Sequence, residues 1–216
     1  DGTFYRIKPE TLFEVHRGKT FASAGAGEPK RQSEIKFIVG TVDINTGEGS
    51  RSIVRTDAAT ADIAARSNVG VDVDPSKATG VSAYSGRVTL STDSGSVTLG
   101  ERERVVARLG SGGLGEKSKI PDPPRLLAPD DVAVFDLARR QPVTLKWSPT
   151  KGAVRYRLQI ARSRLFIPDS IVAVDDRPLP ETALKVTEEG AFYWRVATLG
   201  KGNVISEWSP TRRFKV

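Results

Sequence analysis

Short runs of alternating apolar and polar residues are the main pattern along this chain. In the first half, Ile35, Phe37 and Val39 occupy alternate positions, and Gly40 follows. Similar runs span 52–56, 61–65, 69–73, 80–84, 87–91 and 96–99. Gly, Asn, Asp or Ser separates most of these runs, which recur at about 8–12 residues, and this spacing predicts an all-β meander, roll or barrel-like sandwich. We predict a strand rather than a helical turn over 60–65.

Glycines punctuate the same region. Gly80, Gly86, Gly95 and Gly100 fall near the ends of the predicted runs. Because glycine accommodates backbone angles that other residues avoid, we expect all four in turns or bulges between strands.

The second half alternates as well, with large aromatic residues at the apolar positions. The residues predicted to form its core are Trp147, Tyr156, Leu158, Trp194 and Val196, and Phe214 and Val216 are also expected to point inward. Strands of this kind within about 95 residues are typical of an immunoglobulin-like β-sandwich.

A segment rich in Gly and Pro separates the two halves. It begins with GSGGLG at residue 110 and ends near Pro121, Pro123 and Pro124, a composition typical of linkers. We therefore predict a first domain over 1–109, a linker over 110–121 and a second domain over 122–216. The hinge region 110–124 is expected to be the site of limited proteolysis.

Charge is distributed unevenly between the halves. The chain of 216 residues has a net charge of +7. Residues 1–120 hold 17 Lys/Arg against 15 Asp/Glu, a net +2, and residues 121–216 hold 16 against 11, a net +5. An anionic partner is therefore expected to bind the second half.

The composition also limits which cysteine chemistry and which membrane or signal segments are expected. The absence of cysteine excludes disulfides, thiolate nucleophiles and cysteine zinc sites. No apolar run approaches the about 18 residues of a membrane span, so none is predicted. The chain starts at Asp1 without the basic and apolar regions of a secretory signal, so we expect a mature or processed piece.

The polar residues do not indicate a catalytic centre. His16 is the single histidine, and Glu14 on the same strand face is its nearest candidate carboxylate. A solvated strand histidine is the favoured interpretation. There is no G-x-S-x-G motif and no sequence signal for a glycosidase carboxylate pair. We expect a protein that is not an enzyme.

Metal, cofactor and nucleic-acid sites are not predicted either. Asp72 and Asp74 share a strand face but lack calcium-loop spacing, and we expect them beside Lys77 or Arg66 as surface charges. The glycines of 110–115 are not followed by a P-loop lysine. Too few aromatic residues face outward for binding single-stranded nucleic acid.

The second half resembles a fibronectin type III domain over 122–216. The motifs that carry this resemblance are VTLKWSP with Trp147, GAVRYRLQIARS with Tyr156, GAFYWRVAT with Trp194, and SEWSPTRRFKV with Trp208. Phe192 stands where the family usually has the tyrosine of the tyrosine corner.

The first half resembles the FecR domain of bacterial envelope proteins over about 1–109. The resemblance rests on Asp1-Gly2-Thr3 followed by YRIKPETLFEV, and on repeated strands that include Tyr84-Ser85-Gly86. FecR domains occur outside the cytoplasm, in iron-signalling regulators or in envelope proteins with carbohydrate-binding modules such as LysM. Further strands precede the Asp-Gly-Thr turn in that family. Without them, an open β edge is expected to support a homo-oligomer or filament.

These resemblances imply a non-enzymatic binding or scaffold protein of the bacterial periplasm, outer envelope or cell surface. Its expected partners are an envelope protein or an anionic glycan or other polymer. The alternatives are a FecR-type signal-transducing regulator and an accessory region of a glycan-active enzyme. The full-length gene product would distinguish them.

One face of the second domain is the predicted partner-binding surface. In the fibronectin-like topology, period-2 alternation collects six residues on the outer face of one sheet: Arg155, Arg157, Tyr193, Arg195, Arg213 and Lys215. The alternative is a solvated face whose arginines pair with Glu188, Glu189 and Glu207.

Overall fold

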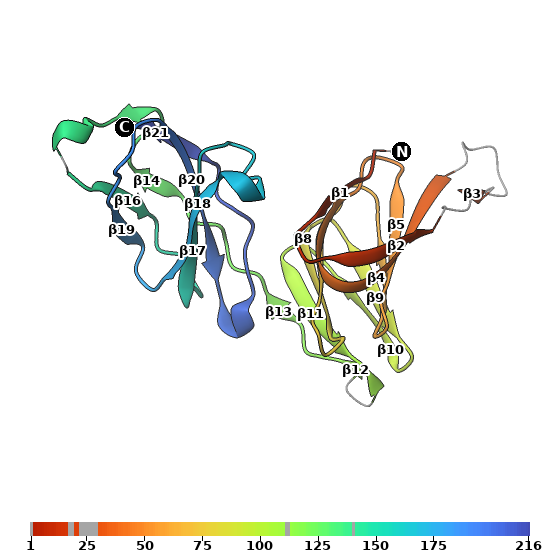
Figure 1. Ribbon diagram of the computed structural model, residues 1–216. Helices are drawn as coiled ribbons and strands as arrows, with labels where there is room; N and C mark the ends of the chain where they lie inside the picture. The colour runs from red at the N-terminus through yellow and green to blue at the C-terminus, as the bar shows by residue number, and fades with distance from the viewer. Residues whose placement is uncertain (1, 17–19, 22–29, 111–112, 140) are drawn as a thin grey trace. The chain divides into compact units, whose positions relative to one another are not determined.

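The computed structural model describes residues 2–16, 20–21, 30–110, 113–139 and 141–216 (Figure 1). Within them, regular structure consists of β-strands and short 3-10 turns. The chain forms two compact units, Asp1–Ile120 and Pro121–Val216. The all-β fold class predicted from the alternation is confirmed.

The first unit is a strongly curved sheet that folds over its own core. Its order is β10-β9-β6-β5-β4-β7-β8-β11-β12, and β1, β2 and β3 pair with β4 while β13 pairs with β11. The strands are β1 (Phe4–Ile7), β2 (Leu12–His16), β3 (Thr20–Phe21), β4 (Lys30–Asn45), β5 (Arg51–Arg55), β6 (Thr60–Ile63), β7 (Asn68–Val73), β8 (Thr79–Ser85), β9 (Val88–Thr92), β10 (Gly95–Leu99), β11 (Glu103–Arg108), β12 (Gly113–Leu114) and β13 (Ser118–Lys119).

The long strand β4 connects the two halves of this sheet. Its first half pairs with β2 and, in parallel, with β5, whereas its second half pairs with β1 and β7. Gly40 lies at the change, with φ of 112°, and a Cβ there would lie 2.4 Å from the hydroxyl oxygen of Thr11. This position therefore requires glycine.

The core of the first unit consists of the inward-facing members of the alternating runs. Phe37 is buried, together with Ile44, Ile63, Leu90 and Leu99. Burial of each such side chain contributes about 1.5–3 kcal/mol to folding, which explains why the alternation dictates the register of these strands.

The predicted linker over 110–121 needs correction, because most of it belongs to the first unit. Strand β12 pairs with Ala107 and Arg108, and β13 pairs with Glu103 and Arg104. The Glu103 carboxylate also accepts hydrogen bonds from Lys117 at 3.2 Å and Lys119 at 3.1 Å. Backbone pairing and charge thus attach this segment to β11 of the first unit, although its composition is typical of a linker.

The prediction for Gly80 also needs correction. Gly80 lies inside β8, not in a turn between strands. A Cβ at this position would lie 2.1 Å from Nη2 of Arg104 and 2.5 Å from Oδ2 of Asp72. Glycine is needed here because two side chains from neighbouring strands meet above its backbone.

The second unit is a sandwich of two sheets, as predicted for an immunoglobulin-like domain. One sheet has the order β14-β16-β19 and the other β15-β21-β20-β17-β18. The strands are β14 (Leu126–Ala128), β15 (Ala133–Val134), β16 (Val143–Trp147), β17 (Arg155–Ala161), β18 (Ile171–Arg177), β19 (Glu181–Leu184), β20 (Ala191–Leu199) and β21 (Arg212–Lys215), and the 3-10 turns are η2 (Leu137–Arg139), η3 (Pro168–Ser170) and η4 (Lys201–Asn203).

Aromatic side chains fill the space between these two sheets. All five residues predicted for the core are buried, and Phe214 joins them. Trp147 and Tyr156 meet edge to face at 5.7 Å between ring centroids, and Phe192 stacks on Phe214 at 5.2 Å. Phe192 therefore stabilises the sandwich by ring stacking.

Candidate functional site

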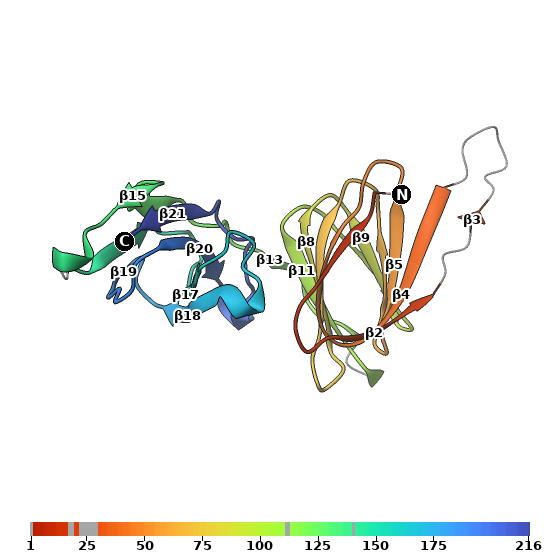
Figure 2. The ribbon, with the colours of Figure 1, turned by 45° about the horizontal axis from the view of Figure 1, so that its top comes forward.

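The five-stranded sheet of the second unit brings the six predicted residues onto one face. Figure 2 shows β17, β18, β20 and β21 side by side, and the register places Gln159 opposite Arg195 and Tyr193 opposite Arg213. Lys215 lies opposite Ala191. Since opposite residues in antiparallel strands share a face, alternation places these residues together. We call this surface the outer face: Arg155, Arg157, Tyr193, Arg195, Arg213 and Lys215.

Arg157 is fixed on this face by a bidentate ion pair with Asp176. Its Nε and Nη2 donate to the two carboxylate oxygens at 2.7 and 2.9 Å. Hydrogen bonding from Arg157 lowers the pKa of Asp176, and the same bond raises the pKa of Arg157. Asp176 was not among the predicted partners. It comes from β18, and its position opposite Arg157 follows from the strand register.

Arg195 is fixed by aromatic rings. Its guanidinium carbon lies 3.9 Å from the ring centroid of Phe166 and 4.4 Å from that of Trp208. Nε and Nη2 also donate to Oε1 of Gln159 at 2.8 and 2.6 Å. Phe166 is buried and has φ of 50°, a left-handed conformation that costs free energy in a residue of this size. The contact between Arg195 and the Phe166 ring therefore helps to hold Phe166 in its strained conformation.

For Arg157 and Glu188, the ion pairs differ from those that the sequence predicted between the arginines of this face and Glu188, Glu189 and Glu207. Glu188 pairs with Arg162, at 2.8 Å, and Arg157 pairs with Asp176. Arg213 and Lys215 are exposed and take part in no ion pair within the described residues. The outer face thus combines two fixed arginines with an exposed cationic pair on β21.

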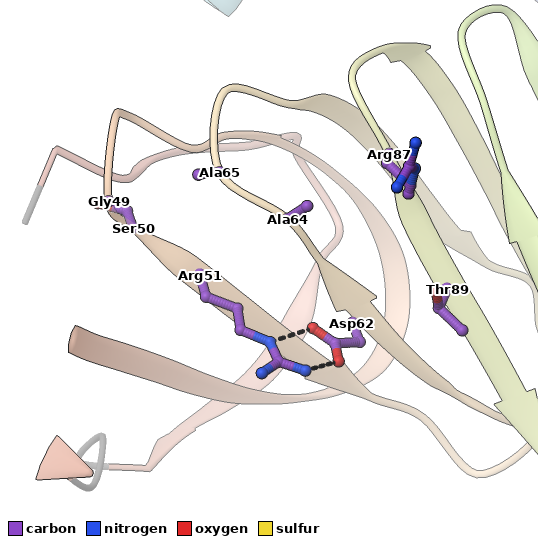
Figure 3. A pocket seen from close by; sticks show the side chains of 8 residues that line it. All are labelled: Gly49, Ser50, Arg51, Asp62, Ala64, Ala65, Arg87 and Thr89. Carbon is purple, nitrogen blue, oxygen red and sulfur yellow. Dashed lines mark hydrogen bonds and ion pairs between the residues drawn. The ribbon is translucent and has the colours of Figure 1, made fainter. Parts of the chain in front are cut away.

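The first unit carries a separate surface hollow of about 350 Å³ (Figure 3). Nε of Arg51 donates to Oδ1 of Asp62 at 2.6 Å, and a second contact joins Nη2 to Oδ2. The hydrogen bond with Asp62 raises the pKa of Arg51. Figure 3 shows the Arg87 side chain directed away from this pair. The lining residues are Gly49, Ser50, Arg51, Asp62, Ala64, Ala65, Arg87 and Thr89.

The carboxylates considered for metal binding have separate structural roles. Asp72 pairs with Arg104, and Asp74 accepts hydrogen bonds from Ser76 and from the Ala78 backbone. The Ser76 bond is the main reason why the pKa of Asp74 is lowered. The expected neighbours were wrong, since Lys77 pairs with Asp57 and Arg66 with Glu48.

Two further observations concern the parts of the chain that the structure describes. No group of three or more His, Cys, Asp or Glu residues in them is arranged to hold a metal ion. None of their helices is long and apolar enough to cross a membrane. The backbone of His16 lies in β2 opposite Glu34, and its side chain lies outside the described part.

Comparison with known proteins gives likenesses to solved structures. No family model matches the chain, and no curated protein matches it. A putative anti-sigma factor from Parabacteroides distasonis is 20% identical with a TM-score of 0.40, covering 55% of this chain and 52% of that protein. The chain thus spans about half of that relative's length.

Two other structures match over most of the chain. The fibronectin(III)-like modules of CbhA from Clostridium thermocellum are 13% identical with a TM-score of 0.34, covering 95% of this chain and 94% of that one. A β-1,2-glucanase from Parabacteroides distasonis is 11% identical with a TM-score of 0.35, covering 99% of this chain and 36% of that one. At these values the likenesses assign neither a family nor an activity.

Proposed function

We propose that this chain is a non-enzymatic binding or scaffold protein that acts outside the bacterial cytoplasm, in the periplasm, the outer envelope or at the cell surface. Its second unit binds an anionic partner, either an acidic envelope protein or an anionic glycan or polymer. The observation that carries the proposal is the exposed pair Arg213 and Lys215 beside the fixed Arg195 on one sheet face.

Charge and rigidity support binding at this face. The second unit has a net charge of +5 from 16 Lys/Arg and 11 Asp/Glu, which attracts anionic partners from a distance. The ion pair of Arg157 and the aromatic contacts of Arg195 hold the surface in one shape before a partner arrives. A partner then loses less entropy on binding than it would against flexible side chains.

The lowered pKa of Glu103 in the first unit has a structural explanation. Strongly shifted pKa values often mark catalytic residues. Here the pKa of Glu103 is lowered to about 2, mainly by the Gly100 backbone hydrogen bond and then by Lys119 and Lys117. The Gly100 bond closes the turn before β11, and the Lys119 contact joins β13 to β11, so the shift accompanies the folding of this turn and the attachment of β13.

A charge-reversal experiment tests the proposal. Retention on an immobilised sulfated polysaccharide and binding to bacterial envelope fractions are measured for the wild-type chain and for Arg213→Glu/Lys215→Glu. The variant should lose binding, and wild-type binding should weaken as salt rises. Arg157 and Arg195 are left unchanged because reversing their charge would also break the contacts that shape the face.

The matched control is Lys151→Glu/Lys185→Glu, which changes net charge equally at exposed positions outside the outer face. It should retain most of the binding. Equal losses in both variants would show a response to net charge alone, and unchanged binding in Arg213→Glu/Lys215→Glu would reject the outer face as the binding surface.

A further inference from the structure

The loop at 162–170, between β17 and β18, exposes two large aliphatic side chains. Leu165 is 80% exposed and Ile167 is 51% exposed. Between them, Phe166 is buried with φ of 50°, and its ring centroid lies 3.9 Å from the guanidinium carbon of Arg195. The loop therefore turns its middle side chain onto the sheet and leaves the side chains on either side of it in solvent.

Hydrogen bonds hold this loop in one conformation. The backbone N–H of Phe166 donates to the Ser163 carbonyl at 3.1 Å, and the N–H of Leu165 donates to Oγ of Ser163 at 3.2 Å. Across the base of the loop, the N–H of Arg162 donates to the Ser170 carbonyl at 2.7 Å. A strained residue that its surroundings hold in place is a candidate functional position.

The outer face next to this loop is cationic. The loop covers Arg195, which belongs to that face. Among the described strand residues, the register places one acid there, Asp176, and it is already ion-paired. In the loop itself, Arg162 and Arg164 outnumber the single acid Asp169. Positive charge is therefore in excess beside the two aliphatic side chains.

Amphipathic aromatic rings lie on the same face. Trp208 and Tyr193 are both half-buried, and the Trp208 ring centroid lies 4.4 Å from the guanidinium carbon of Arg195. Indole and phenol rings combine an apolar body with a polar group, and they favour the boundary between hydrocarbon and water. Exposed aliphatic side chains, amphipathic rings and cations thus occur together on one side of the second unit.

This combination fits the layers of an anionic lipid bilayer. Aliphatic side chains gain free energy when they enter the acyl boundary, and arginine and lysine are attracted to anionic head groups. A highly charged glycan satisfies only the cations, because it offers little hydrocarbon surface to Leu165 and Ile167. A bilayer satisfies the aliphatic side chains and the cations at once.

We infer that the outer face docks on a bilayer that contains anionic lipids, with Leu165 and Ile167 inserted among the acyl chains. Arg164, Arg213 and Lys215, which are exposed, then contact the head groups. This docking rests on the cationic face of the proposed function and adds a lipid surface to its anionic partners. Because only two aliphatic side chains insert, binding should be reversible and should require anionic lipid.

Cosedimentation of the complete chain with lipid vesicles tests this docking. Vesicles of phosphatidylglycerol and phosphatidylcholine in equal amounts should bind the wild type, and vesicles of phosphatidylcholine alone should bind it far less. Leu165→Ser/Ile167→Ser should reduce binding by about tenfold or more, because each large aliphatic side chain that leaves water contributes to binding. Wild-type chain that stays in solution with the anionic vesicles would overturn the inference.

The matched control is Val154→Ser/Leu179→Ser, which removes two exposed aliphatic side chains elsewhere. They are 55% and 65% exposed and lie at the other end of β17 and β18, before Arg155 and after Arg177. This variant should bind vesicles like the wild type. Equal losses in the two serine variants would show a response to overall hydrophobicity and would overturn the role of the loop.

Retention on the sulfated polysaccharide separates this docking from the proposed function. Leu165→Ser/Ile167→Ser should be retained like the wild type, whereas Arg213→Glu/Lys215→Glu should lose both polysaccharide and vesicle binding. Polysaccharide retention without vesicle binding would overturn the lipid docking and leave the proposed function intact. Vesicle binding without polysaccharide retention would support the lipid docking and count against a polymer as partner.

A fluorescent label measures insertion directly, because the natural chain contains no cysteine. An environment-sensitive dye on Leu165→Cys should shift its emission to the blue when anionic vesicles are added, and the same dye on Leu179→Cys should not. An unshifted dye at position 165 on bound chain would show attraction by charge alone and overturn the insertion. Capture of a protein from delipidated envelope fractions through Leu165 and Ile167, without vesicle binding, would assign the loop to a protein partner instead.

Discussion

Arg104 forms a bidentate ion pair with Asp72 directly above the backbone of Gly80. Nη1 of Arg104 donates to Oδ1 at 2.6 Å, and Nη2 donates to Oδ2 at 3.0 Å. The three residues lie on the adjacent strands β11, β7 and β8. The missing side chain at Gly80 leaves the room in which the two charged groups meet, so three strands are joined at one point.

Replacing Gly80 with Ala should therefore destabilise the first unit. The new methyl group would displace the guanidinium and separate it from Asp72, leaving a half-buried charge without its partner. The expected loss in the free energy of unfolding is about 1–3 kcal/mol, measured by urea denaturation. Gly100→Ala is the control, since a Cβ there meets nothing closer than 3.8 Å. Equal effects of the two changes would contradict the role of the ion pair.

Glu103 should make the stability of the first unit depend on acidic pH. Its folded-state pKa is lowered from 4.5 to about 2. A group whose folded-state pKa is lowered stabilises the fold at pH values above its unfolded-state pKa. This stabilisation is lost as the pH falls through the folded-state pKa. The difference in the free energy of unfolding between the wild type and Glu103→Gln should thus be constant above pH 4.5. It should decline between pH 4.5 and about pH 2.

Denaturant midpoints across this pH range give the measurement. Lys117→Met/Lys119→Met removes two of the groups that lower the pKa of Glu103, so its acid-induced loss should be smaller and should be complete at a higher pH than in the wild type. A wild-type loss that is already complete at pH 4.5 would show that Glu103 lacks these contacts in solution.

Truncation tests the attachment of residues 113–120 to the first unit. A fragment of residues 1–120 should unfold at a higher urea concentration than a fragment of residues 1–109, because the shorter one lacks β12, β13 and both lysine contacts to Glu103. Circular dichroism during urea titration compares the two. Identical midpoints would restore the interpretation of this segment as a linker.

Trp194 should be a major contributor to the stability of the second unit. It is 0% exposed in the core between the two sheets. Truncation to Ala should cost about 3–5 kcal/mol in the free energy of unfolding. Leu165→Ala, at a position that is 80% exposed, is the control and should have little effect. A cost below about 1 kcal/mol for Trp194→Ala would mean that the register of β20 differs from the one described.

The sequence by itself determined the all-β class, the burial of the core and the composition of the outer face. Side chains alternate between the two faces of a strand, so residues 192–196 carry their own burial pattern, and the spacing of aromatic residues predicted the core around Trp147 and Trp194. The grouping of the six outer-face residues followed once the order of the neighbouring strands was taken from the fibronectin-like topology.

Tertiary structure alone decided which groups those residues contact. Asp176 lies 19 positions from Arg157, and Phe166 and Trp208 reach Arg195 from two different loops. Gly80 and residues 113–120 were misinterpreted for the same reason. Their local composition is typical of a turn and a linker, whereas their structure depends on Arg104, Asp72 and Glu103 of other strands. Contacts between strands depend on register and on strand order, which are properties of the whole fold that no short segment contains.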